Sequence, residues 1–464
     1  MNKVSRGFKF VFDWSLCLLP VFIVAGIIDF RFHDYFWPGL DALRPLGSLA
    51  MFDLFSVASL FVWFLVAVYL VAALFVREIR PRLGFRWIYL VLIFLAAGVV
   101  VSKVSYVGLE PVIRSFYFQV YINYISPVLM FLVLYFGLSG KGGEGREGRA
   151  KLFERFQRSF LIVFGLFGLT ILFKYFLGVL PGGSVDYLDR LAWPYIDPFF
   201  EMKAESANWL SYIFGPTLVL AVLRGVKKIF AAKKVAWKSL WLEGVFVLIA
   251  GLILLLTKSY TGLAVTGLLC LYLLFINVPR TWKKYIVAGV VVLMIGFVVT
   301  QYNTRKFQIL IGNDSQETSL NRRSQIYTFN YEAFKMYPLE GIGPGNYQAF
   351  FRENVDEILP EHGIPEIELP PHPHNLATFW WSDLGIFGFL AILMIYAMTF
   401  FGIFRPERNE YFVVVGYFLA HGLLDLPYAM EENSLMFWVF LAMALVAYNV
   451  TRPQVKTGRK RKSL

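Results

Sequence analysis

The sequence has few charged residues and almost no cysteine. Only 16% of its 464 residues are charged and 58% are hydrophobic, whereas a soluble globular domain is about 25% charged and about 45–50% apolar. The hydrophobic residues also cluster in runs of about 20, the length of a helix that crosses a hydrocarbon core. This excludes an ordinary soluble protein. The two cysteines, Cys17 and Cys270, both lie in such runs, so no disulfide framework is predicted.

The hydrophobic runs predict an all-α fold, a polytopic integral membrane helical bundle of about twelve transmembrane helices. No clear small-x-small cleavage site follows the first run, so we expect that run to be kept as a helix. The expected spans lie near residues 10–28, 50–76, 87–102, 115–138, 159–180, 208–223, 239–257, 260–278, 285–301, 376–403, 411–427 and 434–450.

The net charge of +12 arises from 44 Lys and Arg residues against 32 Asp and Glu residues. Most of these cations fall in alternate loops and near the two ends, which the positive-inside rule assigns to the cytoplasm. Both termini are therefore predicted to be cytoplasmic. The basic tail 451–464 is predicted to contact anionic membrane lipids, and no nucleic-acid partner is expected.

The expected spans divide the chain into four parts. Residues 1–301 hold nine helices, 302–374 form a large external loop, 375–450 hold three helices, and 451–464 are the cytoplasmic tail. Loops of this length are usually functional or disordered. Because residues 302–374 carry many aromatic side chains, we expect an ordered, functional loop.

Within this loop, residues 320–337 are predicted to form a helix. Tyr327, Tyr331 and Phe334 recur at helical spacing and would line one face, against either the membrane interface or the bundle. Pro338 would end the helix, and the glycine-rich segment 341–346 would form a turn. That segment is not a nucleotide-binding loop, since no strand precedes it and no Gly-Lys-Ser/Thr follows it.

The segment Pro371-His372-Pro373-His374-Asn375 places a titratable imidazole where the loop meets a hydrophobic span, and ionisable groups there are usually functional. Nine residues separate Asn375 from Gly385, and two more separate Gly385 from Gly388. This H-N-x9-G-x-x-G spacing resembles the signature of the O-antigen ligase family, which includes related polysaccharide polymerases. The resemblance covers mainly residues 186–220 and 255–390.

The resemblance extends upstream to Arg323. Family members carry an arginine, an aromatic residue four positions later, a proline eleven positions after that, and then G-x-G. The corresponding residues in this chain are Arg323, Tyr327, Pro338, Gly341 and Gly343. A planar guanidinium suits a diphosphate because it donates two parallel hydrogen bonds. Arg323 is therefore predicted to bind the diphosphate of the substrate, and a plain surface charge or helix cap is the alternative.

Three further cations are predicted to contact the diphosphate. Arg190 precedes the Asn-containing start of a span, as in the family, but could pair with a neighbouring aspartate instead. Lys258 lies in a tight turn where many relatives have Ser-Arg and this chain has Ser259-Tyr260. It would supply a point charge or simply snorkel at the interface. Arg322, next to Arg323, is the third.

The resemblance implies that His374 is the general base and that Asn375 orients its ring or the substrate. An imidazole that titrates near neutrality suits this role. The alternative is a loop histidine that caps the following span. His372 and the intramembrane Asp383 are further candidates, and Asp383 could instead pair with Lys174.

No metal and no other cofactor is predicted. A first metal alternative would use ligand types near the histidine motif, namely His362, His372, His374, Glu361, Glu366 and Glu368, but their spacing matches no fixed zinc pattern. A second would use Asp34 and Asp41 of the first external loop, where no convincing acidic pair is found.

The resemblance implies a multi-pass glycosyltransferase of the bacterial inner membrane, with its active site in the periplasmic loop. It would move a glycan from undecaprenyl diphosphate to a lipid A-core hydroxyl in lipopolysaccharide biosynthesis, inverting the anomeric centre without a metal. An O-antigen or exopolysaccharide polymerase, or a protein O-oligosaccharyltransferase, would share the motif. The non-enzyme alternative is a transporter of the same polyprenyl-linked glycan, which leaves His374 and Asn375 without a role.

Overall fold

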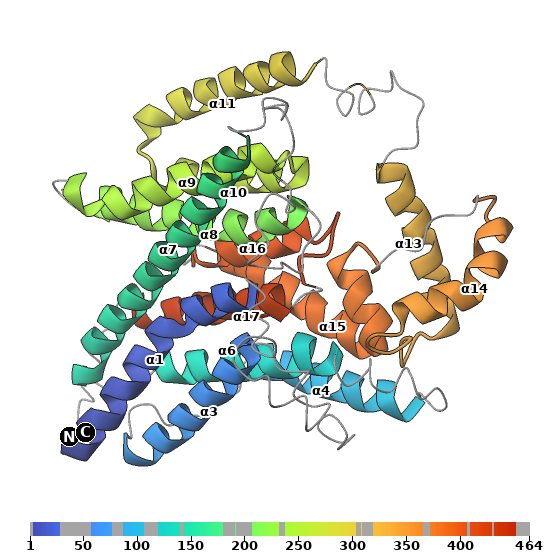
Figure 1. Ribbon diagram of the computed structural model, residues 1–464, viewed down its shortest axis with the longest axis horizontal. Coiled ribbons are helices and arrows are strands. Elements are labelled where there is room, and N and C mark those ends of the chain that lie inside the picture. The colour runs from blue at the N-terminus through green and yellow to red at the C-terminus, as the bar shows by residue number, and fades with distance from the viewer. Residues whose placement is uncertain are drawn as a thin grey trace, which may run out of the picture.

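The computed structural model describes residues 3–27, 57–76, 87–105, 119–139, 143–179, 191, 207–231, 237–302, 308, 319–364, 372–405, 409–428 and 431–451. Within these ranges the fold is all-helical and no residue forms a strand. Figure 1 shows a bundle of long helices, with α13 and α14 at one edge of it. The predicted all-α class is confirmed.

Each expected span coincides with helical structure. The helices concerned are α1 (Lys3–Ile27), α3 (Val57–Phe75), α4 (Trp87–Ser105), α6 (Ser126–Leu138) with the preceding π-helical turn Tyr121–Ile125, α7 (Gly143–Val179), α8 (Ala207–Ala231), α9 (Trp241–Thr257), α10 (Tyr260–Asn277), α11 (Arg280–Gln301), α15 (Leu376–Phe404), α16 (Phe412–His421) and α17 (Glu431–Thr451). A short 3₁₀ turn, Trp237–Ser239, precedes α9.

Seven helical segments in the described part of the chain are long and apolar enough to cross a membrane. They belong to α1, α3, α6 with its π-helical turn, α7, α8, α10 and α15, while α4, α9 and α16 contain shorter apolar segments. A helical membrane protein follows from these lengths. The number of twelve spans stays a prediction.

Helix α17 is surrounded by the rest of the bundle. Every side chain from Glu431 to Ala444 is buried, and the helix packs against α6, α16, α1 and α7. A helix buried on all sides in this way belongs to a core. Helix α11, at the outside of the bundle in Figure 1, instead exposes Val291, Val292, Ile295 and Val299, which suits contact with lipid tails.

The predicted loop helix is confirmed as α13 (Ser319–Met336), and its aromatic residues do not share one environment. Tyr331 is 56% exposed, while Phe334 packs against Trp381 of α15, so the aromatic stripe does not form one buried face. α13 packs against α15 and also against a helix that was not predicted, α14 (Tyr347–Glu361). The cluster between them consists of Ile326, Phe329, Phe351, Ile358 and Leu359.

Helix α15 is interrupted at Gly385, which has a φ of 60°. The predicted turn after α13 fills the break, because the Ile342 N–H donates to the Ser382 carbonyl at 2.7 Å. Backbone groups freed inside a membrane bundle need such protein partners. A Cβ at position 385 would collide with the carbonyl of Leu339, so a glycine is required there. The break thereby fixes α13 and its turn to the start of α15.

Candidate active site

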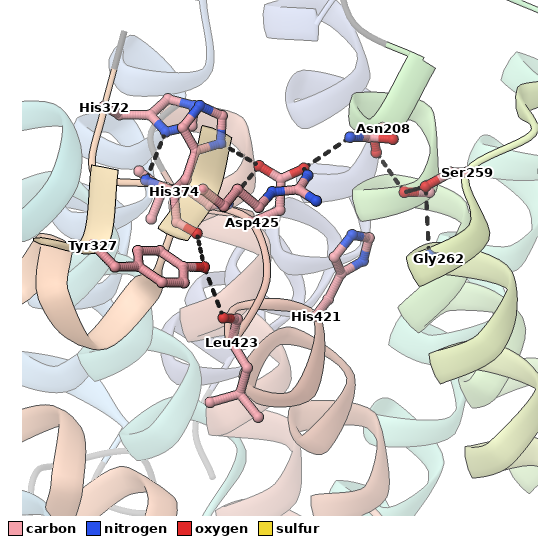
Figure 2. A network of polar contacts seen from close by, with 12 residues as sticks. Asn208, Ser259, Gly262, Tyr327, His372, His374, His421, Leu423 and Asp425 are labelled. Atoms are coloured by element: carbon pink, nitrogen blue, oxygen red, sulfur yellow. Dashed lines mark hydrogen bonds and ion pairs between the residues drawn. The ribbon is translucent and has the colours of Figure 1, made fainter. Parts of the chain in front are cut away.

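Five parts of the chain that are distant in sequence meet at one end of the bundle (Figure 2). They are the first turns of α8 and α10, the helix α13, the segment 372–375 before α15, and the turn 422–426 after α16. Helix ends leave backbone groups unpaired and can therefore be built into polar binding sites. The polar side chains of these parts converge on Asp425.

Asp425 is a buried carboxylate, with 6% of its side chain exposed. Its Oδ1 lies 3.3 Å from Nδ1 of His374, and its Oδ2 accepts a hydrogen bond of 2.8 Å from Asn208. The guanidinium of Arg323 lies 3.5 Å from the same Oδ2. Burial alone would raise the pKa of Asp425, but hydrogen bonds from His374 and Tyr212 and the charge of Arg323 lower it below its ordinary value. Asp425 is therefore ionised.

The tautomer of His374 follows from the state of Asp425. An ionised carboxylate only accepts hydrogen bonds, so Nδ1 of His374 carries the hydrogen between them, and in the neutral form of the ring Nε2 is the acceptor. The backbone of His374 has a φ of 53°, which is uncommon for residues other than glycine and concentrates at functional sites. The side chain is 23% exposed, so a ligand can reach it.

Asn375 holds the histidine segment in place. Its Oδ1 accepts from the N–H groups of Ala377 at 2.9 Å and Thr378 at 3.1 Å, which caps α15. Its Nδ2 donates to the carbonyl of Leu423 at 2.9 Å. The amide thus fixes the start of α15 to the turn that carries Asp425. A direct contact of Asn375 with the substrate stays a prediction.

Helix α13 holds the same segment from the other side. The Tyr327 hydroxyl lies 3.1 Å from the carbonyls of both His374 and Leu423. Asn330 donates to the carbonyl of Pro373 at 3.1 Å and accepts from the hydroxyl of Tyr347 of α14 at 2.9 Å. The aromatic residue four positions after Arg323 therefore fixes the backbone of the proposed base.

His372 packs against His374, with their ring centroids 4.2 Å apart. Its Nδ1 accepts from the backbone N–H of His374 at 3.2 Å, and burial lowers its pKa to about 3, so the ring is neutral. One nitrogen of each imidazole and one oxygen of Asp425 lie within 4.8 Å of one another. These three residues could hold a metal ion.

Within the described part of the chain, the larger zinc alternative is not assembled. His362 lies away from the other histidines, with Nε2 3.2 Å from the carboxylate of Glu332. Glu361 ends α14 and is exposed. Glu366, Glu368, Asp34 and Asp41 lie outside the described residues.

His421, the last residue of α16, lies beneath this cluster and is fully buried (Figure 2). Its Nδ1 is 2.9 Å from the Tyr417 hydroxyl, which donates to the carbonyl of Ser211 at 2.6 Å. Because the Tyr417 hydroxyl already donates its hydrogen to that carbonyl, Nδ1 of His421 must donate to the Tyr417 oxygen. Nε2 is then an acceptor, and no partner for it is found among the described residues.

Of the four cations predicted to bind the diphosphate, Arg323 is seen to contact the Asp425 cluster. Arg323 joins the site through Asp425, and Arg322 precedes it on α13. Lys258 caps the end of α9 with a φ of 50°, and Ser259 caps the start of α10. The turn thus lies beside the first turn of α8, since the hydroxyls of Ser259 and Ser211 are 3.4 Å apart. Arg190 lies outside the described residues.

Asp383 is separate from this cluster. It lies roughly 13 Å from His374 along α15, from the helical rise, and it is buried. Its Oδ2 accepts from the Tyr124 hydroxyl at 2.8 Å, and its backbone carbonyl accepts from Ser102 at 2.8 Å. The suggested lysine partner, Lys174, has a side chain outside the described part of the structure.

Asp425, Asn208 and His421 were not predicted as site residues. A usable signal existed for two of them, because Asn208 begins an expected span and Asp425 ends one on the side predicted for His374. His421 gave less signal, since a single histidine in an apolar helix is usually a core residue.

Comparison with protein families matches residues 245–393 to the model described as O-antigen ligase. The matched segment contains Lys258, Arg322, Arg323 and the histidine segment 372–375, and it ends before Asp425. The comparison with curated proteins gives no match. At the level of the family, this supports a membrane glycosyltransferase of ligase or polymerase type. Residues 245–393 thus match the O-antigen ligase family model, which supports assigning the protein to that family.

Proposed function

We propose that this protein is an O-antigen ligase that moves a glycan from undecaprenyl diphosphate to a hydroxyl of a lipid A-core acceptor. The reaction is a single, inverting displacement and needs no metal. One observation carries the proposal: a buried carboxylate, Asp425, holds both the imidazole of His374 and the guanidinium of Arg323. A base and a phosphate-binding group are thereby brought to one place.

His374 acts as the general base. Its Nδ1–H faces Asp425, so Nε2 is free to accept the proton of the acceptor hydroxyl. As that O–H bond breaks, the oxygen forms a bond to the anomeric carbon, and the bond from this carbon to the diphosphate oxygen breaks. Asp425 stabilises the imidazolium that results, as the aspartate does in a Ser-His-Asp triad.

Arg323 stabilises the diphosphate as negative charge develops on it. It is 17% exposed and its contact with Asp425 is long, at 3.5 Å, so the guanidinium can turn toward a ligand. Arg322, Lys258 and Arg190 are the further cations assigned to the diphosphate. The first turns of α8 and α10 lie on the Asn208 side of the cluster, and helix N-termini attract anions.

The predicted topology supports this assignment. The starts of α8, α10 and α15 and the end of α16 are all predicted to face away from the cytoplasm, and these ends build the cluster. The proposal therefore places the site at the periplasmic side of the inner membrane, with both termini cytoplasmic. A lipid-linked donor would reach it from the outer leaflet, its tail remaining in the bilayer.

The acceptor is tested by reconstitution. Purified protein in liposomes with an undecaprenyl-diphosphate-linked glycan is offered a lipid A-core, a second lipid-linked glycan, and a Ser/Thr-containing acceptor protein together. A ligase places the glycan on the lipid A-core. Elongated lipid-linked glycan would identify a polymerase, and a glycosylated protein would identify a protein O-oligosaccharyltransferase; either result overturns the choice of acceptor.

The substitution His374→Asn distinguishes the proposed enzyme from a transporter of the same lipid-linked glycan. Asparagine tolerates a positive φ, and its amide can replace Nδ1–H toward Asp425, but it offers no base at the position of Nε2. An enzyme loses transfer and still binds the donor. A transporter keeps most of its flux across the liposome membrane, and that outcome contradicts the proposed function.

A further inference from the structure

We propose that His372, His374 and Asp425 form a binding site for a divalent transition-metal ion such as Zn²⁺, and that the bound ion inhibits the enzyme. The three residues approach one another from the segment before α15 and the turn after α16 (Figure 2). The inhibitory effect rests on the proposed function of His374, whereas the binding of the metal does not.

The distances suit a tetrahedral ion. Zn²⁺ binds imidazole nitrogen at about 2.0–2.1 Å and carboxylate oxygen at about 2.0–2.2 Å, which places two ligands of a tetrahedron about 3.3–3.5 Å apart. Nδ1 of His374 and Oδ1 of Asp425 are already 3.3 Å apart. His372 completes the set within 4.8 Å, so a side-chain movement of about 1 Å closes the site, with the fourth position left to water.

The backbone brings the two imidazoles together. Pro373 between them is buried, and the positive φ of His374 turns that residue so that both rings lie on one side. In an extended chain, successive side chains point to opposite sides and residues i and i+2 point to the same side. The spacing of two residues between His372 and His374 therefore also favours two rings on one side. The arrangement exists before any ion binds, which reduces the ordering that binding requires.

The hydrogen between His374 and Asp425 marks the position that the ion would take. When the ion replaces it, the hydrogen of the neutral His374 ring moves from Nδ1 to Nε2.

That replacement explains the inhibition. With the ion on Nδ1, the neutral ring of His374 carries its hydrogen on Nε2, and this nitrogen can no longer accept the proton of the acceptor hydroxyl. Metal binding and base catalysis therefore exclude each other on the same ring.

The positive charge of Arg323 weakens the binding of a metal ion at this site. Its guanidinium lies 3.5 Å from Oδ2 of Asp425 and repels a second positive charge at Oδ1. Removing this charge should tighten metal binding, although the same change weakens binding of a diphosphate. This opposite response separates the metal site from a general loss of structure.

The test uses the full-length protein in detergent, purified with a tag that contains no histidine. Co²⁺ replaces Zn²⁺ as the probe, because tetrahedral Co²⁺ absorbs visible light and is displaced by Zn²⁺. We expect His372→Ala to weaken Co²⁺ binding at least about tenfold, as loss of a ligand or its partner does, and Arg323→Gln to strengthen it about tenfold. His362→Ala, in a histidine paired with Glu332, is the matched control and should leave the affinity unchanged.

Unchanged affinity in His372→Ala overturns the proposal, and so does loss of binding in His362→Ala, which would place the ion on α13 and α14. Weaker binding in Arg323→Gln contradicts the charge argument. If His372→Ala does not fold, judged by its elution as a single species, His372→Gln takes its place. In the transfer assay, the Zn²⁺ concentration for half-inhibition should rise at least about tenfold in the His372 variant, relative to its own uninhibited rate.

Discussion

Helix α8 has a buried polar cluster near each end, and only one of them is suited to chemistry. The site cluster consists of Asn208, Arg323, His374 and Asp425. The inner cluster consists of Gln157, Arg224, Lys228 and Glu243. Both combine a carboxylate, a guanidinium and a side-chain amide inside a membrane bundle, so residue type alone does not distinguish them.

The inner cluster is built from regular helices and tight contacts. Arg224 of α8 donates to Glu243 of α9 at 3.1 Å and to Gln157 of α7 at 2.6 Å, and Lys228 lies 2.7 Å from Glu243. The side chains of Arg224 and Glu243 are only 5% and 4% exposed. Such a cluster locks three helices together and has little access to a ligand.

The site cluster is built from helix ends and turns, and its contacts are longer. The side chains of Arg323 and His374 are 17% and 23% exposed, at 3.5 Å and 3.3 Å from Asp425. One member, His374, has a positive φ. The comparison suggests that chemistry requires a reachable imidazole whose partners can rearrange, whereas a structural cluster is closed and made of helical side chains.

The largest effect on transfer is expected for His374→Asn. Removing the base should lower the transfer rate by about 10³-fold, within the usual range for general-base catalysis, while donor binding and folding persist. His374→Ala is a poorer test, because alanine at a positive φ also destabilises the fold. The measurement is single-turnover transfer in liposomes together with donor binding. Transfer within about twofold of the unmodified protein would show that His374 is not the base.

A smaller loss is expected for Asp425→Asn. The amide keeps the shape but no longer fixes the tautomer of His374 or stabilises its charged form, so transfer should fall about 10²-fold. Asp383→Asn is the matched comparison, because this buried carboxyl of α15 contacts Tyr124 instead of the histidine. We expect Asp383→Asn to lower transfer less than Asp425→Asn does. A larger loss of transfer in Asp383→Asn than in Asp425→Asn would indicate that Asp383 of α15 is the functional carboxylate.

Arg323→Gln should act on the donor more than on the acceptor. Loss of a charge-assisted hydrogen bond to the diphosphate, worth about 1.5–3 kcal/mol, should raise the KM for the lipid-linked donor by about 10–100-fold. The matched control is Lys335→Gln, on the same helix but 51% exposed and paired with Glu332, which should change the KM for donor little. An unchanged KM in Arg323→Gln would make Arg323 a structural partner of Asp425 only.

Much of the fold was predictable from the sequence because long apolar runs have few alternatives to membrane helices. The expected spans coincide with helices, and α13 and the turn after it were placed correctly. Helix α14 was missed because its apolar positions serve a small local cluster with α13 and not the bundle. The surroundings of the α13 aromatic residues were left open between the membrane interface and the bundle, and the structure places Tyr327 against the His374 backbone and Phe334 against Trp381 of α15.

The site was predictable only in part. His374 and Arg323 could be proposed because their spacing matches a family pattern, and Lys258 because it lies in the turn where relatives carry an arginine; the matched segment 245–393 contains all three. Asp425 and Asn208 lie outside that segment and join the site through the packing of α8 and α16, which sequence spacing does not encode. Asn375 was predicted to orient the base, and its capping contacts place it as a support for the His374 backbone.

The smallest effect on transfer, and a large one on stability, is expected for Glu243→Gln in the inner cluster. The change leaves the buried Arg224 and the partly exposed Lys228 without their carboxylate, and breaking the buried pair with Arg224 costs about 3–5 kcal/mol. The folded fraction should still transfer glycan at nearly the normal rate, because no member of the inner cluster reaches Asp425. Thermal unfolding in detergent measures the first effect and transfer per folded molecule the second. Glu154→Gln is the matched control, since its pair with Arg158 is about half exposed and worth only about 0.3–0.5 kcal/mol. A loss of transfer greater than the loss of folded protein would mean that the two ends of α8 are coupled, and the distinction between a structural and a catalytic cluster would then fail.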